Sequence, residues 1–345
     1  MKNLISKLLL CMLVVISIIG CKDPENISIS TNFEKLDDKP LHIGDKLPLD
    51  FNTKDGIIDS YSIKLNDKIY DKKNIILDES NAKLGSNYLV LTVNYNGKYK
   101  KEIDATFTVF PKEKEKDITY KIFQEYPHNP ELFTQGFTYK DGWITESSGL
   151  YGKSLLVKYK LGSTSYTQSV KIDPKYFAEG FALLDKKLYL LTWREKKGLI
   201  FNESDFKLEK EFTYPGTLFE GWGATTIGDK IVVSDGSSEL KFYDKNFNLQ
   251  KRITVIGYEN VYSRINELEY ADGYIFANVF DQPIILIIDP ENGTVIAKAD
   301  FSELVKQNKS NEEAVLNGIA YMEGNTFLIT GKLWPKMYRV GFEMK

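Results

Sequence analysis

The sequence predicts an all-β protein, a five-bladed β-propeller preceded by a small immunoglobulin-like β-sandwich. A short motif recurs five times, and its aligned positions lie 44, 43, 45 and 50 residues apart, at Gly136, Gly180, Gly223, Leu268 and Gly318. Each copy opens an apolar run, and a second run that ends in a polar or aromatic cluster follows. The chain also contains 21 Tyr and 20 Phe, which favour strands. Five repeats of this length in a strand-rich chain are typical of a propeller.

Composition limits the possible functions. The chain has 345 residues, enough for two domains, and a net charge of −3, which is not the balance of a nucleic-acid-binding protein. Cys11 lies in the predicted leader, so Cys21 is the one cysteine left for a mature chain and no internal disulfide is expected. His42 and His128 lie outside the repeated motifs, which argues against a zinc site, a His-rich metal centre or a Ser-His-Asp triad.

Residues 1–20 are predicted to be a lipoprotein signal peptide. Two lysines precede the apolar run 8–19, which is too short to span a membrane comfortably. The run ends in I-I-G-C, where the glycine before Cys21 resembles the lipobox of bacterial lipoproteins, in which the cysteine is acylated. An ordinary signal peptide with a chance cysteine is the alternative. We expect residues 21–27 to be a tether, and the protein to be lipid-anchored in the bacterial cell envelope, as a periplasmic or outer-membrane lipoprotein.

Residues 28–110 predict the sandwich. Alternating apolar runs are separated by turns such as K-D-G and Y-N-G, and they cover 41–51, 57–65, 68–77, 88–95 and 101–110. We interpret them as a small antiparallel β-sandwich that serves as a spacer or an interaction module, because no motif in it carries chemistry. The following run P-K-E-K-E-K-D at 111–117 is mixed in charge and predicts a solvated linker.

Residues 118–345 predict the five blades. In each repeat one motif starts the first strand and the other ends the second, and these ends lie side by side in an antiparallel hairpin. The first strands of a propeller line its axis, so the clusters should converge on one mouth of the central channel. The last blade is predicted to contain strands at 314–321, 326–331 and 336–342, and the segment 118–126 is expected to complete it and remove an exposed edge.

Several residues of these clusters invite a functional interpretation. Placing Glu179, Trp193 and Lys332 near the propeller axis would cost free energy, so we expect these residues to have a function there. The motif glycines are explained more simply as markers of blade corners. Asp235 and Ser237 belong to S-D-G-S, which an Asp-Gly turn explains without any catalytic role.

The clusters occur in one order: F-T-Q-G-F, E-S-S-G-L-Y-G-K-S, A-E-G-F, L-T-W, E-G-W-G, S-D-G-S, N-E-L-E-Y, A-N-V, N-G-I-A-Y and T-G-K-L-W-P. Together they closely resemble the glutamine cyclotransferase family of plant and bacterial type, the five-bladed propeller glutaminyl-peptide cyclotransferases. The resemblance covers residues 120–345. It implies that N-terminal glutaminyl residues of peptide or protein substrates become pyroglutamate with release of ammonia, by intramolecular acyl transfer without a metal or other cofactor. Such a reaction requires proton shuttling, oxyanion stabilisation and a pocket that folds the glutamine onto itself.

The resemblance also implies roles for two charged residues. Glu179 would be the catalytic carboxylate, which takes a proton from the attacking amine and returns one to the leaving nitrogen. Lys332 would stabilise the oxyanion or hold Glu179 in place. A structural Glu179 that caps backbone amides is the alternative, in which case Glu220 or Glu267 would take the catalytic role.

The remaining family positions are substrate contacts. Gln135 and Asn266 would bond the substrate amide and backbone, although side-chain bonds that stabilise a corner explain them equally well. An aromatic wall would orient the substrate and exclude water. It would consist of Phe133, Phe177, Trp193, Trp222 and Phe280.

Four aromatic positions leave questions open. Phe280 departs from the family, where A-N-V is usually followed by Trp, so the ring is kept and the indole N–H is not. For Phe133 and Phe177, packing in a core is as good an explanation as a place in the wall. Trp334 either faces the same side as Lys332 or packs between blades.

Two other functions compete with the cyclotransferase. A lipid-anchored, non-catalytic propeller that binds ligands or peptides would have no need of Glu179 and Lys332. A metal-dependent hydrolase of the lactonase type would need several axial Asp, Glu, Asn or His ligands and would be sensitive to chelators.

Overall fold

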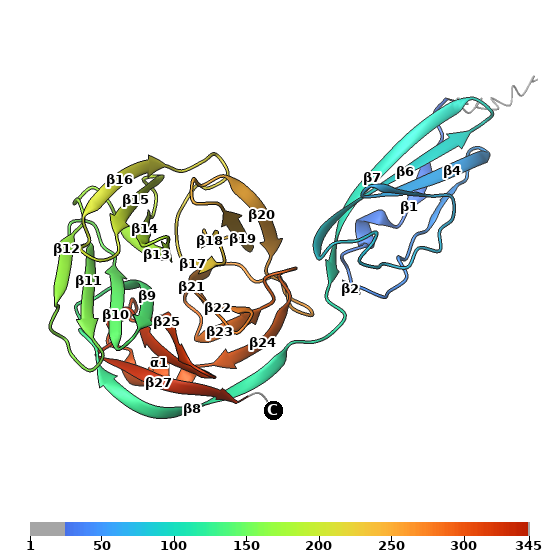
Figure 1. Ribbon diagram of the computed structural model, residues 1–345. Helices are drawn as coiled ribbons and strands as arrows, with labels where there is room; N and C mark the ends of the chain where they lie inside the picture. Colours follow the sequence, from blue (N-terminus) through green and yellow to red (C-terminus); the bar gives the residue numbers. More distant parts are fainter. Residues whose placement is uncertain (1–24, 344–345) are drawn as a thin grey trace, which may run out of the picture.

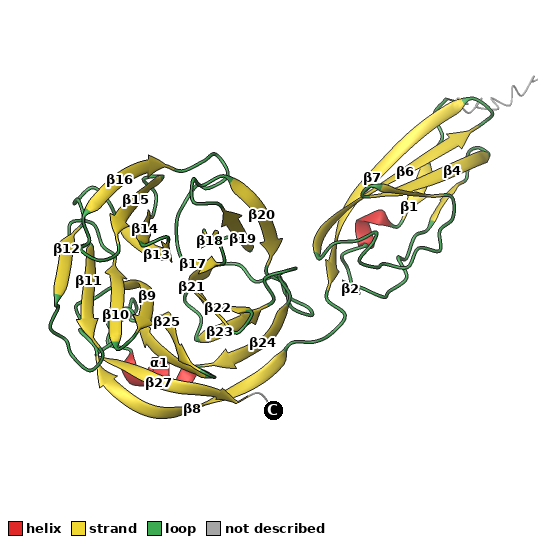
Figure 2. Ribbon diagram, viewed as in Figure 1, coloured by secondary structure: helices red, strands yellow, loops and turns green. Residues whose placement is uncertain are grey.

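The computed structural model describes residues 25–343 and confirms the all-β class (Figure 1). Apart from strands, this described part contains one short α-helix, α1 (Ser302–Asn308), and one 3-10 turn, η1 (Phe33–Lys35), both visible in Figure 2. The predicted signal peptide and the lipidation of Cys21 lie outside the described residues. Within 25–343, no helix has the length and apolar character needed to cross a bilayer.

The N-terminal region contains a five-stranded sheet in the order β2-β7-β6-β4-β5 and a separate β1–β3 pair. The strands of this region are β1 (Ile29–Thr31), β2 (Leu41–His42), β3 (Phe51–Thr53), β4 (Ile58–Leu65), β5 (Lys68–Tyr70), β6 (Gly85–Tyr95) and β7 (Tyr99–Phe110). All pairs are antiparallel except β2 with β7, which is parallel.

Two predicted strands of this region are wrong. The segment 41–51 is a loop between two short strands, because Gly44 turns the chain at φ +101° and Pro48 has no N–H to donate to a sheet. The segment 68–77 is extended only as far as Tyr70, where the polar run D-K-K-N ends the strand.

The C-terminal region is built from four-stranded units. Three of them are separate sheets, and in each sheet the four strands lie side by side in the order of the sequence. Their strands are β9 (Thr134–Lys140), β10 (Trp143–Ser148), β11 (Leu155–Lys160) and β12 (Gln168–Lys171); β13 (Ala178–Leu184), β14 (Lys187–Thr192), β15 (Lys197–Asn202) and β16 (Leu208–Thr213); β17 (Ala224–Ile227), β18 (Lys230–Ser234), β19 (Glu239–Tyr243) and β20 (Leu249–Thr254).

The other two units are joined into one eight-stranded sheet, because β24 pairs in parallel with the start of β8. One unit contains β21 (Ile265–Ala271), β22 (Tyr274–Val279), β23 (Ile284–Ile288) and β24 (Val295–Asp300). The other contains β25 (Leu316–Glu323), β26 (Thr326–Gly331), β27 (Lys336–Glu343) and β8 (Lys116–Pro127). The helix α1 lies between them and was not predicted from the sequence; it occupies the longest interval between repeats.

The five units are arranged in a ring (Figure 1). The innermost strands contact one another in a closed cycle, β9 to β13, β17, β21, β25 and back to β9. The predicted pairing of the two ends of this region is present, since β8 runs antiparallel to β27 and places Tyr120 opposite Phe342. The last unit therefore combines strands from both ends of the region, which removes an open sheet edge.

The prediction of a solvated linker at 111–117 is wrong at Glu115, which is buried. Its carboxylate accepts hydrogen bonds from the Tyr258 N–H at 2.9 Å and the Tyr262 hydroxyl at 3.1 Å. Lys298 adds an ion pair at 3.6 Å, and His42 of the N-terminal sheet stacks on Tyr258 with ring centroids 4.1 Å apart. These contacts attach the N-terminal region to the loop that precedes β21.

A β-bulge marks the start of four of the five inner strands, as the shifts in pairing register show. A bulge leaves a residue unpaired and changes the direction of its side chain. The residues in the bulges belong to the repeated motifs: Gln135 in β9, Glu179 in β13, Asn266 and Glu267 in β21, and Asn317 in β25. The repeats detected in the sequence therefore correspond to one local backbone feature that directs polar side chains.

Candidate active site

Glu179 and Lys332 are buried charged residues, 5% and 3% exposed. Glu179 lies in the bulge of β13, and Lys332 directly follows β26. Within residues 25–343, neither side chain makes a hydrogen bond or an ion pair. The Lys332 ammonium instead lies against two rings, 4.7 Å from the centroid of Phe133 and 5.1 Å from that of Phe280.

Burial shifts the titration of both groups toward neutrality. Burial raises the pKa of the Glu179 carboxyl well above its usual range, and the charge of Lys332 opposes this shift. Burial lowers the pKa of Lys332 from 10.5 to about 8, with the Glu179 charge acting in the opposite direction. Two buried groups of opposite charge type, both with pKa values moved in the direction that favours the neutral form, are suited to proton transfer.

The other two candidate carboxylates already have partners. Glu267 is buried and accepts the Ile319 N–H at 2.9 Å, which links β21 to β25. Glu220 accepts both indole N–H groups, from Trp193 at 2.9 Å and from Trp222 at 3.0 Å, and pairs with Arg194. Capping of backbone amides, the alternative considered for Glu179, is therefore what Glu267 does.

The aromatic residues of the predicted wall form a continuous chain of contacts. Phe177 meets Phe133 and Trp193 edge to face, with centroids 6.2 and 5.5 Å apart. Trp222 meets Phe280 edge to face at 5.7 Å. The Glu220 carboxylate accepts a hydrogen bond from each indole, and the Lys332 ammonium lies against both Phe280 and Phe133. These contacts connect the aromatic side chains in a closed ring. Because Glu179 interacts electrostatically with both Lys332 and Glu220, its carboxylate belongs to the same site.

Two motif glycines make room for these rings. A Cβ atom at Gly236 would lie 2.6 Å from the Trp222 ring, and one at Gly149 would lie 2.4 Å from the Phe177 ring. Gly236 also has φ +78°, which favours glycine. The S-D-G-S and E-S-S-G motifs thus hold the wall in position.

The side-chain amides in and around the predicted substrate contacts have only some of their hydrogen-bonding atoms paired within the described chain. Gln135 Oε1 accepts a hydrogen bond from Asn317 Nδ2 at 3.2 Å. In the described part of the chain, three buried amide atoms have no hydrogen-bond partner: Asn266 Oδ1, Asn278 Nδ2 and Asn317 Oδ1. Asn278 and Asn317 belong to A-N-V and L-N-G-I but were not selected from the sequence, because only their burial among the motif residues distinguishes them.

Other motif residues are structural. Trp334 is fully buried in a hydrophobic cluster, so it packs in the core and does not face the site. Asp235 accepts the Ser237 N–H within the predicted turn and forms a buried ion pair with Lys241.

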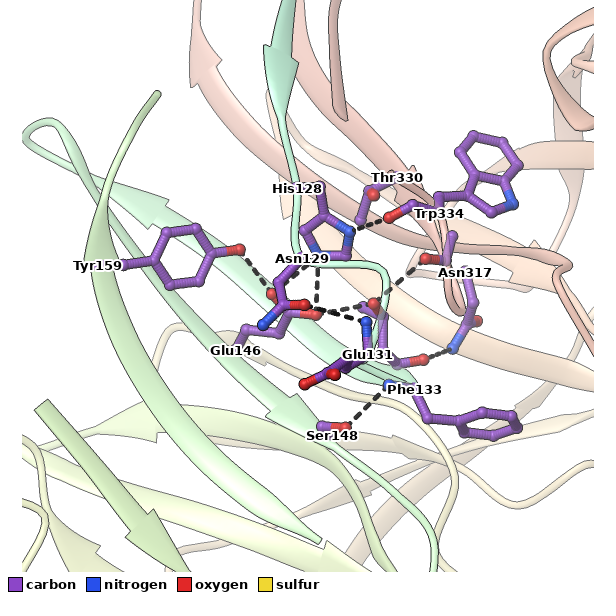
Figure 3. Close-up of polar contacts among 12 residues, drawn as sticks. His128, Asn129, Glu131, Phe133, Glu146, Ser148, Tyr159, Asn317, Thr330 and Trp334 are labelled. Atoms are coloured by element: carbon purple, nitrogen blue, oxygen red, sulfur yellow. Dashed lines mark hydrogen bonds and ion pairs between the residues drawn. The ribbon is translucent and has the colours of Figure 1, made fainter. Parts of the chain in front are cut away.

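Sequence reasoning missed two further groups beside the site. At its edge, Tyr151 meets Phe177 with centroids 5.4 Å apart and donates to Glu195 at 2.6 Å. In the segment that leads to Phe133, His128 forms a buried pair with Glu146 (Figure 3). Histidine content and spacing gave no signal for this pair, because its partners are set by the tertiary fold. Residues 25–343 contain no group of three or more His, Cys, Asp or Glu side chains placed to hold a metal ion.

Comparisons with known proteins identify similar chains. A family model described as glutamine cyclotransferase matches residues 91–342, so the match begins inside β6 of the N-terminal sheet. A glutaminyl-peptide cyclotransferase of Arabidopsis thaliana is 33% identical over 226 residues, which cover 64% of this chain and 70% of the plant protein. The crystal structure of Myxococcus xanthus glutaminyl cyclase matches with a TM-score of 0.61 and 34% identity, and it covers 66% of this chain and 98% of that one.

Proposed function

The chain belongs to the glutamine cyclotransferase family, an enzyme family, and from this premise we propose that it converts N-terminal glutaminyl residues of peptides to pyroglutamate. In this reaction the α-amine of the substrate forms a bond to its own side-chain carboxamide carbon. The bond from that carbon to the amide nitrogen breaks, and ammonia leaves with the proton that the α-amine gives up.

The same premise supports a finer description of the fold. The five four-stranded units would be the blades of a five-bladed propeller that spans about residues 118–345, preceded by an immunoglobulin-like domain at 28–110. The closed cycle of inner strands supports the five blades.

Glu179 would carry the proton between the two nitrogens. The observation that carries this proposal is a buried carboxylate without a hydrogen-bond partner in the described chain, next to a buried lysine. A raised pKa makes the carboxylate a stronger base toward the attacking amine, and the resulting acid can protonate the leaving nitrogen. General acid–base catalysis of this kind contributes roughly 10²–10⁴-fold to a rate.

Lys332 would stabilise the oxyanion that develops on the carboxamide oxygen. Its ammonium is held between Phe133 and Phe280 and donates no hydrogen bond within residues 25–343, so its donors are available to the substrate. In a site from which water is excluded, a positioned charge stabilises a developing anion strongly. Gln135 and Asn266 would bind the amide groups of the substrate, and the aromatic wall would fold its aliphatic part.

We also propose a cellular location, on the basis of the N-terminal sequence. Acylation of Cys21 after I-I-G-C would place the enzyme on a membrane of the bacterial cell envelope, where peptides with N-terminal glutamine would be its substrates. Substitution of Cys21 by Ala should release the protein from the membrane fraction. Continued membrane attachment of that variant would contradict the lipid anchor.

Ammonia release from a glutaminyl dipeptide tests the proposed activity. A soluble chain that starts after Cys21 is assayed with and without EDTA, beside Glu179→Gln. We expect EDTA-insensitive turnover that falls at least about 10²-fold in the variant while the fold is kept. A folded wild-type protein that binds the peptide without releasing ammonia would instead support a binding propeller, and loss of turnover in EDTA would indicate a metal-dependent reaction.

A further inference from the structure

His128 and Glu146 form a charged pair with fully buried side chains (Figure 3). The His128 Nε2 atom lies 3.1 Å from Glu146 Oε2 and 3.2 Å from Oε1. The carboxylate also accepts the Thr134 hydroxyl at 2.7 Å and the Tyr159 hydroxyl at 2.6 Å. Although burial opposes protonation, the charge of Glu146 raises the pKa of His128 above its usual value, so the ring can donate from both nitrogens.

The other ring nitrogen of His128 reaches the loop that carries Lys332. Nδ1 donates to the backbone carbonyl of Trp334 at 2.7 Å, as Figure 3 shows. Two backbone bonds run beside it, from His128 N to Pro335 O at 2.9 Å and from Leu333 N to Leu132 O at 2.8 Å. The loop 331–335 is thus fastened to the segment that leads into Phe133 and Gln135.

The loop needs such an attachment because its backbone is strained. Leu333 has φ +59°, a left-handed conformation that costs free energy for a residue other than glycine. It is the neighbour of Lys332, whose own N–H bonds to Val315 O at 2.9 Å. The bonds from 128–132 hold Leu333 in this conformation, and the position of the Lys332 side chain follows from it.

Stability alone does not account for the buried pair. Replacing a buried ion pair by apolar side chains of similar volume is often neutral or stabilising, so the pair is weak evidence for a purely structural function. Both ring nitrogens of His128 are occupied by Glu146 and the Trp334 carbonyl, so the ring has no polar atom left for a substrate. What the pair does is join two segments that each carry residues of the site.

We propose that His128, held by Glu146, is a positioning residue that fixes the Lys332 ammonium over Phe133 through its bond to the Trp334 carbonyl. The proposal deepens the cyclotransferase assignment and rests on it for its effect on turnover. The charged groups that face Lys332 are Glu179 and Glu313. If the loop relaxes, water reaches the ammonium, and the pKa of Lys332 moves from about 8 back toward 10.5.

Two isosteric substitutions separate the bonds of His128. The amide nitrogen of His128→Asn takes the place of Nδ1 and keeps the bond to Trp334, whereas that of His128→Gln takes the place of Nε2 and keeps the bond to Glu146. Asn308→Ala is the matched control, since it removes a buried amide that bonds to Leu304 and Tyr338. For each variant, kcat, KM, the pH dependence of kcat and the thermal midpoint are measured with a glutaminyl dipeptide.

We expect His128→Gln to lower kcat about 10- to 100-fold with little change in KM, as for a catalytic group displaced by about 1 Å. The alkaline limb of kcat against pH for this variant should move from about pH 8 to a higher pH. His128→Asn should keep most of the activity, and Asn308→Ala should lower the thermal midpoint without this pattern. Equal losses in His128→Gln and His128→Asn, or losses that follow the thermal midpoint in all three variants, would overturn the proposal.

A measurement without substrate separates this proposal from the proposed function. The pKa of Lys332 is read by NMR after reductive ¹³C-methylation, with Lys332→Arg to assign its signal. A higher pKa in His128→Gln than in the wild type supports positioning, even if the wild type releases no ammonia and the cyclotransferase proposal fails. An unchanged pKa overturns positioning, whatever the turnover.

Discussion

Replacing Lys332 by methionine should stabilise the fold while it removes turnover. The pKa of Lys332 falls from 10.5 in water to about 8 in the folded protein, a difference of about 2.5. At 1.36 kcal/mol for each pKa unit, keeping the ammonium charged in its buried position costs about 3 kcal/mol below pH 8. Methionine fills a similar volume without a charge, so Lys332→Met should gain roughly 1–3 kcal/mol at pH 7.

The dependence of this gain on pH has a definite sign. Between pH 8 and 10.5 the folded protein holds Lys332 neutral while the unfolded chain still binds its proton. Stability rises with pH wherever the unfolded state binds more protons, so the wild type becomes more stable over this range. The difference between Lys332→Met and wild type is therefore full below pH 8 and shrinks as the pH approaches 10.5.

Thermal and urea unfolding between pH 6 and 10 measure the effect, with about 2–4 °C expected for each kcal/mol in a region of this size. The substitution is also made in a Glu179→Gln background. In that background the stability gained from Lys332→Met should be larger, because a neutral glutamine does not offset the buried charge of the ammonium as the Glu179 carboxylate does. A Lys332→Met protein that is less stable than the wild type at pH 7, by an amount independent of pH, would refute the reasoning.

Two further substitutions test the aromatic wall. Gly236→Ala should raise KM about tenfold in steady-state kinetics, because its Cβ would lie 2.6 Å from the Trp222 ring. Gly142→Ala is the control and should leave KM unchanged, since Gly142 has a similar φ of +82° but open space around its Cβ. Phe280→Trp should hold the Lys332 ammonium more strongly, since an indole face attracts a cation better than a phenyl face. The alkaline limb of kcat against pH should then move upward, and an unmoved limb would show that this ring does not set the charge of Lys332.

The sequence predicted the strands of the ring well, because their signal is local. In the last unit, strands were expected at 314–321, 326–331 and 336–342, and they are found at Leu316–Glu323, Thr326–Gly331 and Lys336–Glu343. Alternation of apolar residues and the turns between them are properties of neighbouring residues. The repeated motifs located the bulges for the same reason, although the sequence did not show that they were bulges.

What the sequence did not predict depends on partners far along the chain. Glu115 looked solvated because it lies in a run of mixed charge, yet its donors are Tyr258 and Tyr262. His128 was set aside because it lies outside the repeated motifs, but its partner Trp334 is 206 residues away. No local pattern encodes such contacts, and the family resemblance assigned roles only to residues within its motifs.

The contrast between Glu179 and Glu267 shows how one backbone feature can give two kinds of carboxylate. Both residues lie in bulges of inner strands, and both are buried with a raised pKa. The carboxylate of Glu267 receives the N–H of Ile319 from the next strand.

At Glu179 the neighbours bind the backbone instead. The Ser147 hydroxyl donates to the Glu179 carbonyl at 2.6 Å, and the next N–H, of Gly180, donates to the Trp222 carbonyl at 2.6 Å. The main chain is thus held on both sides while the carboxylate is left without a partner in the described chain. An unpaired buried carboxylate costs stability, and a fixed backbone beneath it reduces the reorganisation that a reaction would require. That combination is expected of a group whose partner is the substrate, and it is the reason to place catalysis at Glu179 when both carboxylates are equally buried.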